Sequence, residues 1–335
     1  MKQIKKHTTA LRCLLAPAAI LLTVNMPAAI AQDADPEAIV TIMRNLSGNQ
    51  KARPSGAKGQ CWQGTFTPTV EAKALSKSPV FTKVSPVIAR FSVGGGNPKV
   101  ADGARGVNRG FSFRIDAGGT GQTEFVMVNA PINFVKSPTQ MLAFLQARVP
   151  GADGKPDADK IKAFTDANPE TTGQGKYLAG KPIAGSWVGT SYWGIHPYTL
   201  TSSVGTKQIV KFRMVPLAGE IGLTDDEAKA KPADYLVADL SSRIAAKTPA
   251  GFEMVAMIGK PGDEKTNATQ LWDNEDKRPQ VKLGTLAITA LEKNETCDST
   301  IFDPTNLAEG LSGPTDDPLF TARQPAYAIS IGNRF

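Results

Sequence analysis

Short runs of strand-forming residues, punctuated by glycine and proline clusters, limit the possible folds of this chain more than any other feature. Clusters such as 94–98 (GGGNP) and 118–121 (GGTG) lie between such runs and predict tight turns. Strands joined by tight turns are typical of an antiparallel sheet or barrel. We predict strands at 61–67, 86–93, 110–115, 123–129, 198–202, 208–215, 252–258 and 281–291.

Helices are predicted where the strand pattern is interrupted. Thr224 followed by two aspartates and Glu227 is a helix N-terminal signal. The other predicted helices cover 33–45, 137–148, 158–168, 233–246 and 317–327. This arrangement favours an α+β fold, an antiparallel β-barrel with helical insertions, over a parallel α/β sheet. No break in composition divides the chain after its first residues, so we expect a single domain over 32–335.

The first 31 residues have the pattern of an export signal. A basic start is followed by a short apolar run, 14–24, and then by Ala29-Ile30-Ala31, which matches a signal-peptidase site. We therefore expect a signal peptide at 1–31, cleaved after Ala31, and a periplasmic or secreted protein. The alternative is an anchor that is not cleaved, although the apolar run is too short to span a membrane as a helix of the mature protein.

The basic character of the chain comes partly from this signal. The net charge is +7, and removal of residues 1–31, which contain four basic and no acidic residues, leaves about +3. No cluster of lysine or arginine alternates with aromatic residues, so nucleic-acid binding is not expected. After signal cleavage we also expect no membrane association.

Two cysteines remain once Cys13 leaves with the signal. In an oxidising compartment Cys61 and Cys297 are candidates for a disulfide that closes a very long loop. The alternative is a pair of buried thiols, because the sequence does not show whether the two residues meet.

Several motifs in one order then point to a known family. Together they resemble the haem catalase superfamily, and most of all its small, exported catalase-related peroxidases, over roughly residues 52–335. The motifs are Arg53-x-x-x-Ala57-Lys58-Gly59, Gly64-x-Phe66, Arg90-Phe91-Ser92, Arg105-x-x-x-Arg109-Gly110-Phe111, Asn129-x-Pro131, Phe302-Asp303-Pro304-x-Asn306-Leu307 and Arg323-x-x-x-Tyr327.

The resemblance implies a haem b cofactor with Tyr327 as the axial ligand of the iron. A tyrosinate is an anionic ligand suited to ferric iron, and tyrosine is the ligand that catalases use. Arg323 lies four residues earlier, one helical turn away, where its guanidinium can donate to the phenolate oxygen. The alternative for the pair alone is a packed tyrosine and a surface arginine on a terminal helix.

Other matching positions are expected around the haem. Arg53 and Arg90 match the arginines that hold the haem propionates through charge-assisted hydrogen bonds, and Arg109 matches a structural position. An ordinary surface role is the alternative for Arg53 and Arg90.

On the peroxide-binding side the resemblance implies three further residues. Asn129 matches the family's distal asparagine, Ser92 matches the serine that orients the distal histidine, and Phe134 matches an aromatic residue near the haem. Without the resemblance, these would be a turn asparagine, a strand serine and a core phenylalanine.

The distal histidine itself is missing. The family motif Arg-x-x-His-Ala-Lys-Gly has Gly56 at the histidine position here, between Arg53 and Ala57 at the usual spacing. The chain has only two histidines: His7 lies in the signal, and His196 is expected to be structural. A positioned base typically contributes about 10²–10⁴ in rate, so its loss predicts weak turnover.

Several functions therefore remain open. The first is a haem peroxidase that acts on organic or hydrogen peroxide with an unknown electron donor, as a monomer or small homo-oligomer. The second is a non-catalytic haem-binding or peroxide-sensing protein. A third is other oxygen or lipid-peroxide chemistry in a pocket enlarged at Gly56, and the last is a barrel that has lost haem, against which the Arg323–Tyr327 pair argues.

Overall fold

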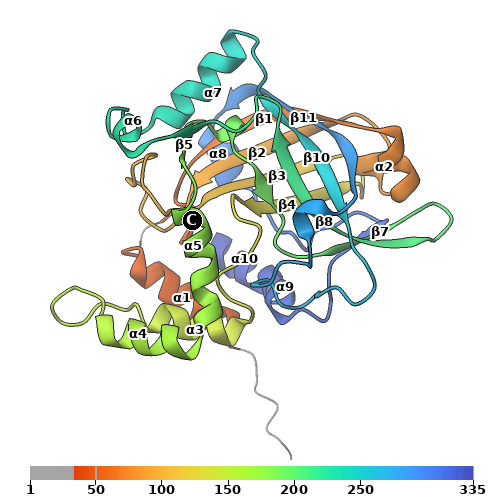
Figure 1. The fold of residues 1–335 in the computed structure, drawn as a ribbon. Helices are drawn as coiled ribbons and strands as arrows, with labels where there is room; N and C mark the ends of the chain where they lie inside the picture. The colour runs from red at the N-terminus through yellow and green to blue at the C-terminus, as the bar shows by residue number, and fades with distance from the viewer. Residues whose placement is uncertain (1–33, 50, 335) are drawn as a thin grey trace, which may run out of the picture. The chain divides into compact units, whose positions relative to one another are not determined.

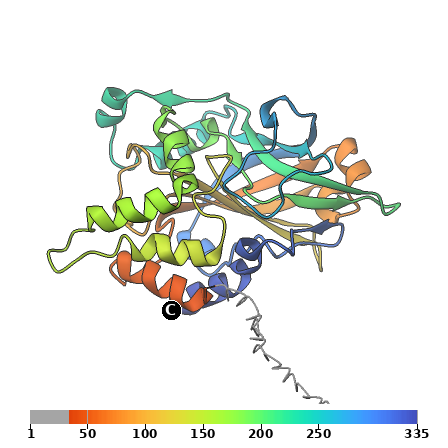
Figure 2. The same cartoon turned by 60° about the horizontal axis from the view of Figure 1, so that its bottom comes forward.

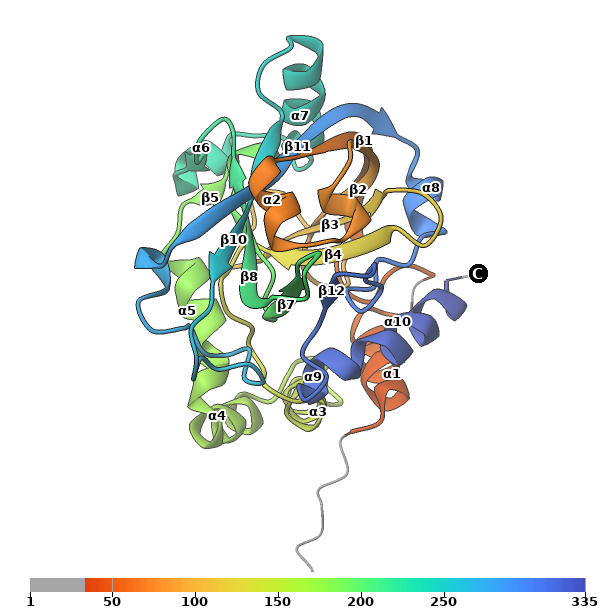
Figure 3. The ribbon, with the colours of Figure 1, turned by 90° about the vertical axis from the view of Figure 1, so that its right-hand side faces the viewer.

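Eight antiparallel strands form a closed barrel in the computed structural model, which describes residues 34–49 and 51–334 (Figures 1 and 3). The barrel is closed by the antiparallel pairing of β8 with β10. In this pairing Val210 lies opposite Ile258 at one end and Pro216 lies opposite Phe252 at the other. Two further strands, β7 (Tyr198–Thr201) and β12 (Leu311–Ser312), extend the sheet beyond β8. In spatial order the barrel strands are β10 (Gly251–Ile258), β11 (Gln280–Glu292), β1 (Lys58–Pro68), β2 (Ser85–Val93), β3 (Arg109–Asp116), β4 (Gln122–Val128), β6 (Tyr192–Trp193) and β8 (Lys207–Pro216).

The alternation of side chains along β2 and β3 separates the core from a second, outer surface. Phe91, Phe111 and Phe113 point into the barrel, where the rings of Phe91 and Phe111 stack at 4.3 Å. The intervening residues Ser92 and Ser112 face outward and are only half-buried. The same period of two residues that builds the core therefore also supplies small polar residues to the outer face of the sheet.

Helices cover this outer face and the ends of the barrel. The α-helices are α1 (Pro36–Leu46), α2 (Val70–Leu75), α3 (Pro138–Gln146), α4 (Ala158–Ala167), α5 (Gly173–Ala179), α6 (Asp225–Lys229), α7 (Tyr235–Ala245), α8 (Asn294–Asp298), α9 (Pro318–Thr321) and α10 (Arg323–Gly332). Shorter elements are the strands β5 (Ile183–Ala184) and β9 (Gly222–Leu223) and the 3₁₀ turns η1 (Pro79–Phe81), η2 (Pro169–Thr172), η3 (Trp187–Gly189) and η4 (Glu275–Lys277).

Helix α1 packs against both α3 and α10, although almost 300 residues separate α1 from α10 in the sequence. Figure 2 shows these helices side by side beneath the strands. The Nη1 atom of Arg44 donates to the carbonyl oxygen of Asn333 at 2.7 Å and joins the ends of α1 and α10. The first and last described helices thus form one layer over the sheet.

The fold class predicted from the sequence is confirmed, and each predicted strand overlaps an observed one. The stretch after 168, for which no helix was predicted, contains η2 and α5. All described residues lie in one compact unit, 33–335. The predicted export signal and its cleavage site lie outside the described residues. Within 34–49 and 51–334, no helix has the length and apolar character needed to cross a membrane.

Candidate functional site

A cavity of about 330 Å³ lies between the helical layer and the outer face of β2, β3 and β4. Residues from α1, α3 and α10 form its wall on the helical side, and Ser92, Gly110, Ser112, Val126 and Val128 form it on the strand side. Most of its lining atoms are apolar carbon, with a few polar groups at defined positions. We call this space the central cavity.

Three of the arginines that line the central cavity form a cluster. They are Arg53, from the segment before β1, Arg90 on β2 and Arg334 after α10. Burial, and next the nearby charge of Arg53, lower the pKa of Arg90 to about 9 and that of Arg334 to about 10. Asp298 offsets part of this effect, but the structure shows no ion pair between it and these arginines among the described residues.

These arginines retain buried donors without partners. The Nε atoms of Arg53 and Arg90 and the Nη2 atom of Arg334 are buried and donate to no described residue. Their other donors bind backbone carbonyls: Arg90 donates through Nη1 to Gly56 at 2.8 Å, and Arg334 through Nη1 to Asp298 at 2.9 Å. A buried cluster of cations with unused donors costs free energy unless an anion binds there. The cluster therefore suits a ligand with more than one negative charge.

The phenol of Tyr327 also faces the central cavity, from α10. The Nη2 atom of Arg323 donates to the phenol oxygen at 2.6 Å, as the one-turn spacing predicts. Burial by itself lowers the pKa of Arg323, but the neighbouring phenols of Tyr327 and Tyr198 raise it above its ordinary value. Arg323 is therefore a permanent cation held next to the Tyr327 oxygen.

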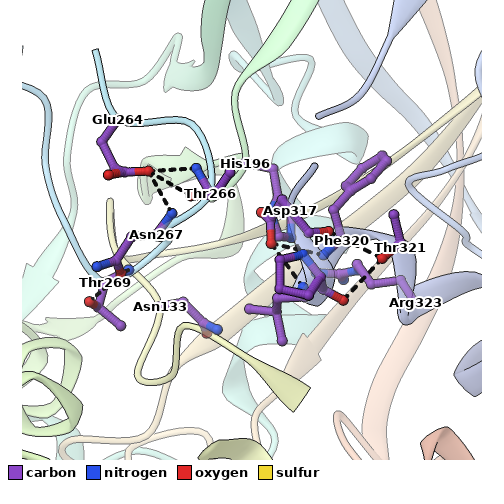
Figure 4. Close-up of polar contacts among 12 residues, drawn as sticks. Asn133, His196, Glu264, Thr266, Asn267, Thr269, Asp317, Phe320, Thr321 and Arg323 are labelled. Atoms are coloured by element: carbon purple, nitrogen blue, oxygen red, sulfur yellow. Dashed lines mark hydrogen bonds and ion pairs between the residues drawn. The ribbon is translucent and has the colours of Figure 1, made fainter. Parts of the chain in front are cut away.

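Behind Arg323, a buried histidine and a carboxylate continue the chain of contacts (Figure 4). His196 and Asp317 are 2% and 1% exposed, and the Nδ1 atom of His196 lies 2.7 Å from Oδ2 of Asp317. The Nη1 atom of Arg323 lies 3.4 Å from Nε2 of His196. Burial, and also the charge of Arg323, lower the pKa of His196 although Asp317 acts in the opposite direction. A neutral imidazole donates from Nδ1 to Asp317 and accepts at Nε2 from Arg323.

The expected distal residues are only partly brought together. Gly56, Ser92 and Phe134 line the central cavity, but Asn129 does not. The Oδ1 atom of Asn129 accepts a hydrogen bond from the backbone N–H of Arg109 at 2.7 Å, at the start of β3. The side chain of Asn129 thus caps the start of β3 in this structure, and its contact with a bound peroxide stays a prediction.

Two neighbours of Asn129 face the cavity instead. Val128 at the end of β4 is apolar, and Asn133 also lines the cavity, with its Nδ2 atom donating to the carbonyl of Val135 at 3.0 Å. The backbone N–H of Asn133 donates to the carbonyl of Ala268 at 2.8 Å. Figure 4 shows Asn133 beside the loop that carries Asn267 and Thr269. This loop is stabilised by Glu264, whose carboxylate accepts from the backbone N–H of Asn267 at 3.0 Å.

Gly56 is held in a conformation that excludes an ordinary side chain. Its φ is +64°, in the left-handed region. A Cβ atom added here would lie 2.9 Å from Oγ of Ser92 and would force a shift. The positive φ therefore favours glycine here, and any side chain at this position would also require Ser92 to move.

The two cysteines are joined by a disulfide that lies next to the arginine cluster. Cys61 on β1 and Cys297 on α8 are bonded, 236 residues apart in sequence. The Nη2 atom of Arg53 donates to the carbonyl oxygens of Cys297 and Thr300. The disulfide thus holds the segment that orients Arg53.

The sequence interpretation missed Arg334 and Asn133. Arg334 lies just after the end of α10, so the helical spacing from Arg323 to Tyr327 does not extend to it and gave no signal for it. Asn133 had no signal either, because the neighbouring Asn129 matched the motif and lies in the same loop segment.

A haem fits the arrangement of these residues. Arg53, Arg90 and Arg334 provide unused buried donors for two propionates, and the lining between them and Tyr327 is largely apolar. The phenol of Tyr327, with Arg323 as its donor, is a suitable axial ligand.

Comparison with known proteins places the chain among catalase-like sequences and folds. The family model described as "Catalase" matches residues 49–335. A "Catalase-related peroxidase" of Synechococcus elongatus is 34% identical over 89% of this chain and 88% of its own length. Another of that name, from Mycolicibacterium paratuberculosis, is 29% identical over 88% of this chain and 93% of its own length. A solved bacterial catalase has a TM-score of 0.75 at 23% identity, covering 97% of this chain and 68% of the other.

Proposed function

This chain belongs to the catalase family, and from that premise we propose that it is a haem-dependent peroxidase that reduces organic peroxides or hydrogen peroxide. We propose haem b as the cofactor. The relatives named catalase-related peroxidases support a peroxide-metabolising oxidoreductase. Beyond what these relatives support, we propose haem as the cofactor, peroxidase rather than catalase activity, and roles for individual residues.

The observation that carries the proposal is that unused arginine donors and the Tyr327 phenol line the same cavity. Arg53, Arg90 and Arg334 would hold the propionates, and Tyr327 would ligate the iron. The chemistry that haem supplies when bound is cleavage of the peroxide O–O bond at its iron.

The residues behind Tyr327 have a definite role in this proposal. Arg323 donates to the phenol oxygen at 2.6 Å and would orient it toward the iron. His196 accepts from the other guanidinium nitrogen at 3.4 Å and is itself oriented by Asp317. Arg323, His196 and Asp317 are therefore positioning residues for the ligand.

The site lacks a side chain that could transfer a proton to or from the peroxide. Gly56 offers no base, and the polar side chains among the proposed distal residues, Ser92 and Asn133, are not bases at neutral pH. The hydroxyl and carboxamide can orient a peroxide or a water through hydrogen bonds. We therefore expect slow turnover, lower by about 10²–10⁴ than with a positioned base.

The same missing base favours a second candidate function. A catalase-fold protein that binds haem and peroxide without rapid turnover would serve as a binding or sensing protein. In both cases we propose export to the periplasm or outside the cell, which the Cys61–Cys297 disulfide supports because such bonds persist in oxidising compartments. The electron donor would be a separate reductant, and the protein a monomer or small homo-oligomer.

Turnover by haem-loaded protein tests the proposal. We expect consumption of cumene hydroperoxide or hydrogen peroxide that depends on an added one-electron donor, with little oxygen evolved from hydrogen peroxide alone. The Tyr327→Phe variant should lose this activity. Rapid oxygen evolution would contradict the assignment as a weak peroxidase, and absence of consumption by the loaded protein would favour the sensing alternative.

A further inference from the structure

A second cavity, of about 560 Å³, adjoins the central cavity. We call it the outer cavity. Its wall comes from the segment between β2 and β3 and from α3, α4, η2 and α5, which lie together in Figure 1. Gly94, Asn108, Phe134 and Gln174 line both cavities. A molecule in the outer cavity therefore lies against the residues that separate it from the proposed reaction site.

The charges on the wall of the outer cavity have one sign. Its charged lining residues are Arg148 and Lys176, and no carboxylate lines it among the described residues. Neither Arg148 nor Lys176 forms an ion pair within the part of the chain that the structure describes. Two carboxylates on the adjoining elements are paired with other lysines: Glu170 with Lys136 at 2.8 Å, and Asp166 with Lys162 at 2.6 Å.

Arg148 is held in place rather than free in solvent. Its guanidinium carbon lies 3.4 Å from the centre of the Phe144 ring, and its Nη1 atom donates to the carbonyl of Phe144 at 2.9 Å. Burial lowers the pKa of this guanidinium, with no carboxylate acting against it. Its Nε and Nη2 atoms donate to no residue in the described ranges, so they remain for a ligand.

The threonine hydroxyls on the wall do not replace these donors. Thr165, Thr171 and Thr172 each donate to a backbone carbonyl of their own segment, at 2.7–2.8 Å. Their oxygens then present lone pairs, so recognition of an anion depends on the two cations. The remaining side chains are mainly apolar, and the rings of Phe134 and Phe144 lie 4.7 Å apart.

We propose that the outer cavity binds the carboxylate of an organic hydroperoxide, through Arg148 and Lys176, while the apolar part of that substrate lies along Phe144 and Phe134 toward the central cavity. This inference rests on the proposed function and narrows its substrate class to hydroperoxides that bear an acid group. It gives a binding role to charged residues outside the haem site.

Calorimetric binding of octanoate to the purified, haem-loaded protein tests the carboxylate site without turnover. Octanamide is the matched neutral ligand. We expect octanoate to bind at least about tenfold more tightly than octanamide, because hydrogen bonds to charged groups are the strong ones. Arg148→Gln should weaken octanoate about tenfold and leave octanamide unchanged, which also shows that the variant is folded. Lys176→Gln should have a smaller effect in the same direction, since this lysine is exposed.

Lys99→Gln is the control: it removes one positive charge from an exposed position outside the cavity lining. It should change the affinity of neither octanoate nor octanamide. Equal binding of octanoate and octanamide, or equal effects of Arg148→Gln and Lys99→Gln, would overturn the proposal.

Steady-state kinetics then test this inference separately from the proposed function. With a hydroperoxy fatty acid, Arg148→Gln should raise KM about tenfold, with no change for its methyl ester. Octanoate should compete with the acid-bearing hydroperoxide. Competition with the reducing donor instead would overturn the assignment of the site to the peroxide. Turnover of cumene hydroperoxide without selective octanoate binding would sink the inference alone, and charge-dependent binding without any turnover would sink the proposed function alone.

Discussion

His196 shows how a single buried side chain connects the barrel to the proposed iron ligand. It lies between Asp317 and Arg323, and Arg323 in turn donates to Tyr327. The sequence interpretation expected only a structural histidine. Its burial agrees with that expectation, while its contacts give it a positioning role that only the structure could reveal.

The lowered pKa of His196 predicts a pH-dependent stability. The unfolded chain binds a proton at this imidazole as the pH falls below about 6.5, whereas the folded protein does so only at a lower pH. The contribution of His196 to stability is therefore fully present above pH 6.5 and falls by up to about 1.4 kcal/mol per pH unit below it.

Urea unfolding of wild type and His196→Gln at pH 7.5, 6 and 5 measures this difference. The variant should lack this component of the pH dependence, so the stability gap between the two proteins should shrink as the pH falls. A gap that is constant or widens toward pH 5 would show that His196 is protonated in the folded protein.

For single residues, the sequence motifs predicted which residue types surround the cavity but not the backbone conformation of each residue. Arg53, Arg90 and Tyr327 all line the cavity that the motifs imply, although their haem-binding roles remain predictions. The motifs also place glycine where the family has histidine, but the positive φ of Gly56 depends on the loop around it. The motif matched Asn129 by residue type, but its hydrogen bond to the backbone of Arg109 depends on how the turn after β4 packs against β3.

At the scale of elements, α1 has a function that its sequence alone does not indicate. Its periodic apolar residues predict a helix with one buried face, but not that this face covers a cavity. Ile39 and Val40 are buried there, and α1 packs on α10, which carries Tyr327. The alignment of α10 therefore depends on an element from the other end of the chain.

Truncation of Ile39 tests this dependence. We expect Ile39→Ala to lower the free energy of unfolding by about 2–5 kcal/mol and to weaken haem retention, because the layer over the cavity loses packing. Thr41→Ala is the control on the exposed face of the same helix and should stay within about 0.5 kcal/mol of wild type. Chemical denaturation gives the stabilities, and haem transfer to an acceptor protein gives the retention. Equal behaviour of the two variants would show that α1 does not support the site.

Elements with a long alternating pattern could be predicted, and short ones could not. β3 alternates buried and half-buried residues over its whole length and was predicted within two residues of its bounds. β6 has only two residues, Tyr192 and Trp193, too few for any periodicity, yet it joins β4 to β8 in the closed barrel. Its pairing is set by the tertiary fold.

For the whole molecule, the disulfide is the strongest covalent constraint on the fold. It connects β1 with α8, which follows the last barrel strand in the sequence, across 236 residues. Constraining so long a loop reduces the conformational entropy of the unfolded chain. The sequence allowed this bond but could not establish that the two residues meet.

Loss of this bond should be measurable in the stability of the whole protein. We expect a Cys61→Ser, Cys297→Ser double variant to be less stable by about 2–5 kcal/mol, and a reductant to destabilise the wild type but not the variant. Because Arg53 donates to the carbonyl of Cys297, the variant should also bind haem more weakly. Denaturant midpoints with and without reductant give the first result, and unchanged midpoints would contradict it.

The absorption spectrum of the haem-loaded protein tests most directly whether the Tyr327 phenol oxygen binds the iron. Wild type should take up one haem per chain and show the charge-transfer bands of ferric iron bound to a phenolate. Tyr327→Phe should lose those bands while Gln324→Ala, an exposed change on the same helix, keeps them. An identical spectrum in Tyr327→Phe, or no haem uptake by the wild type, would contradict the assignment.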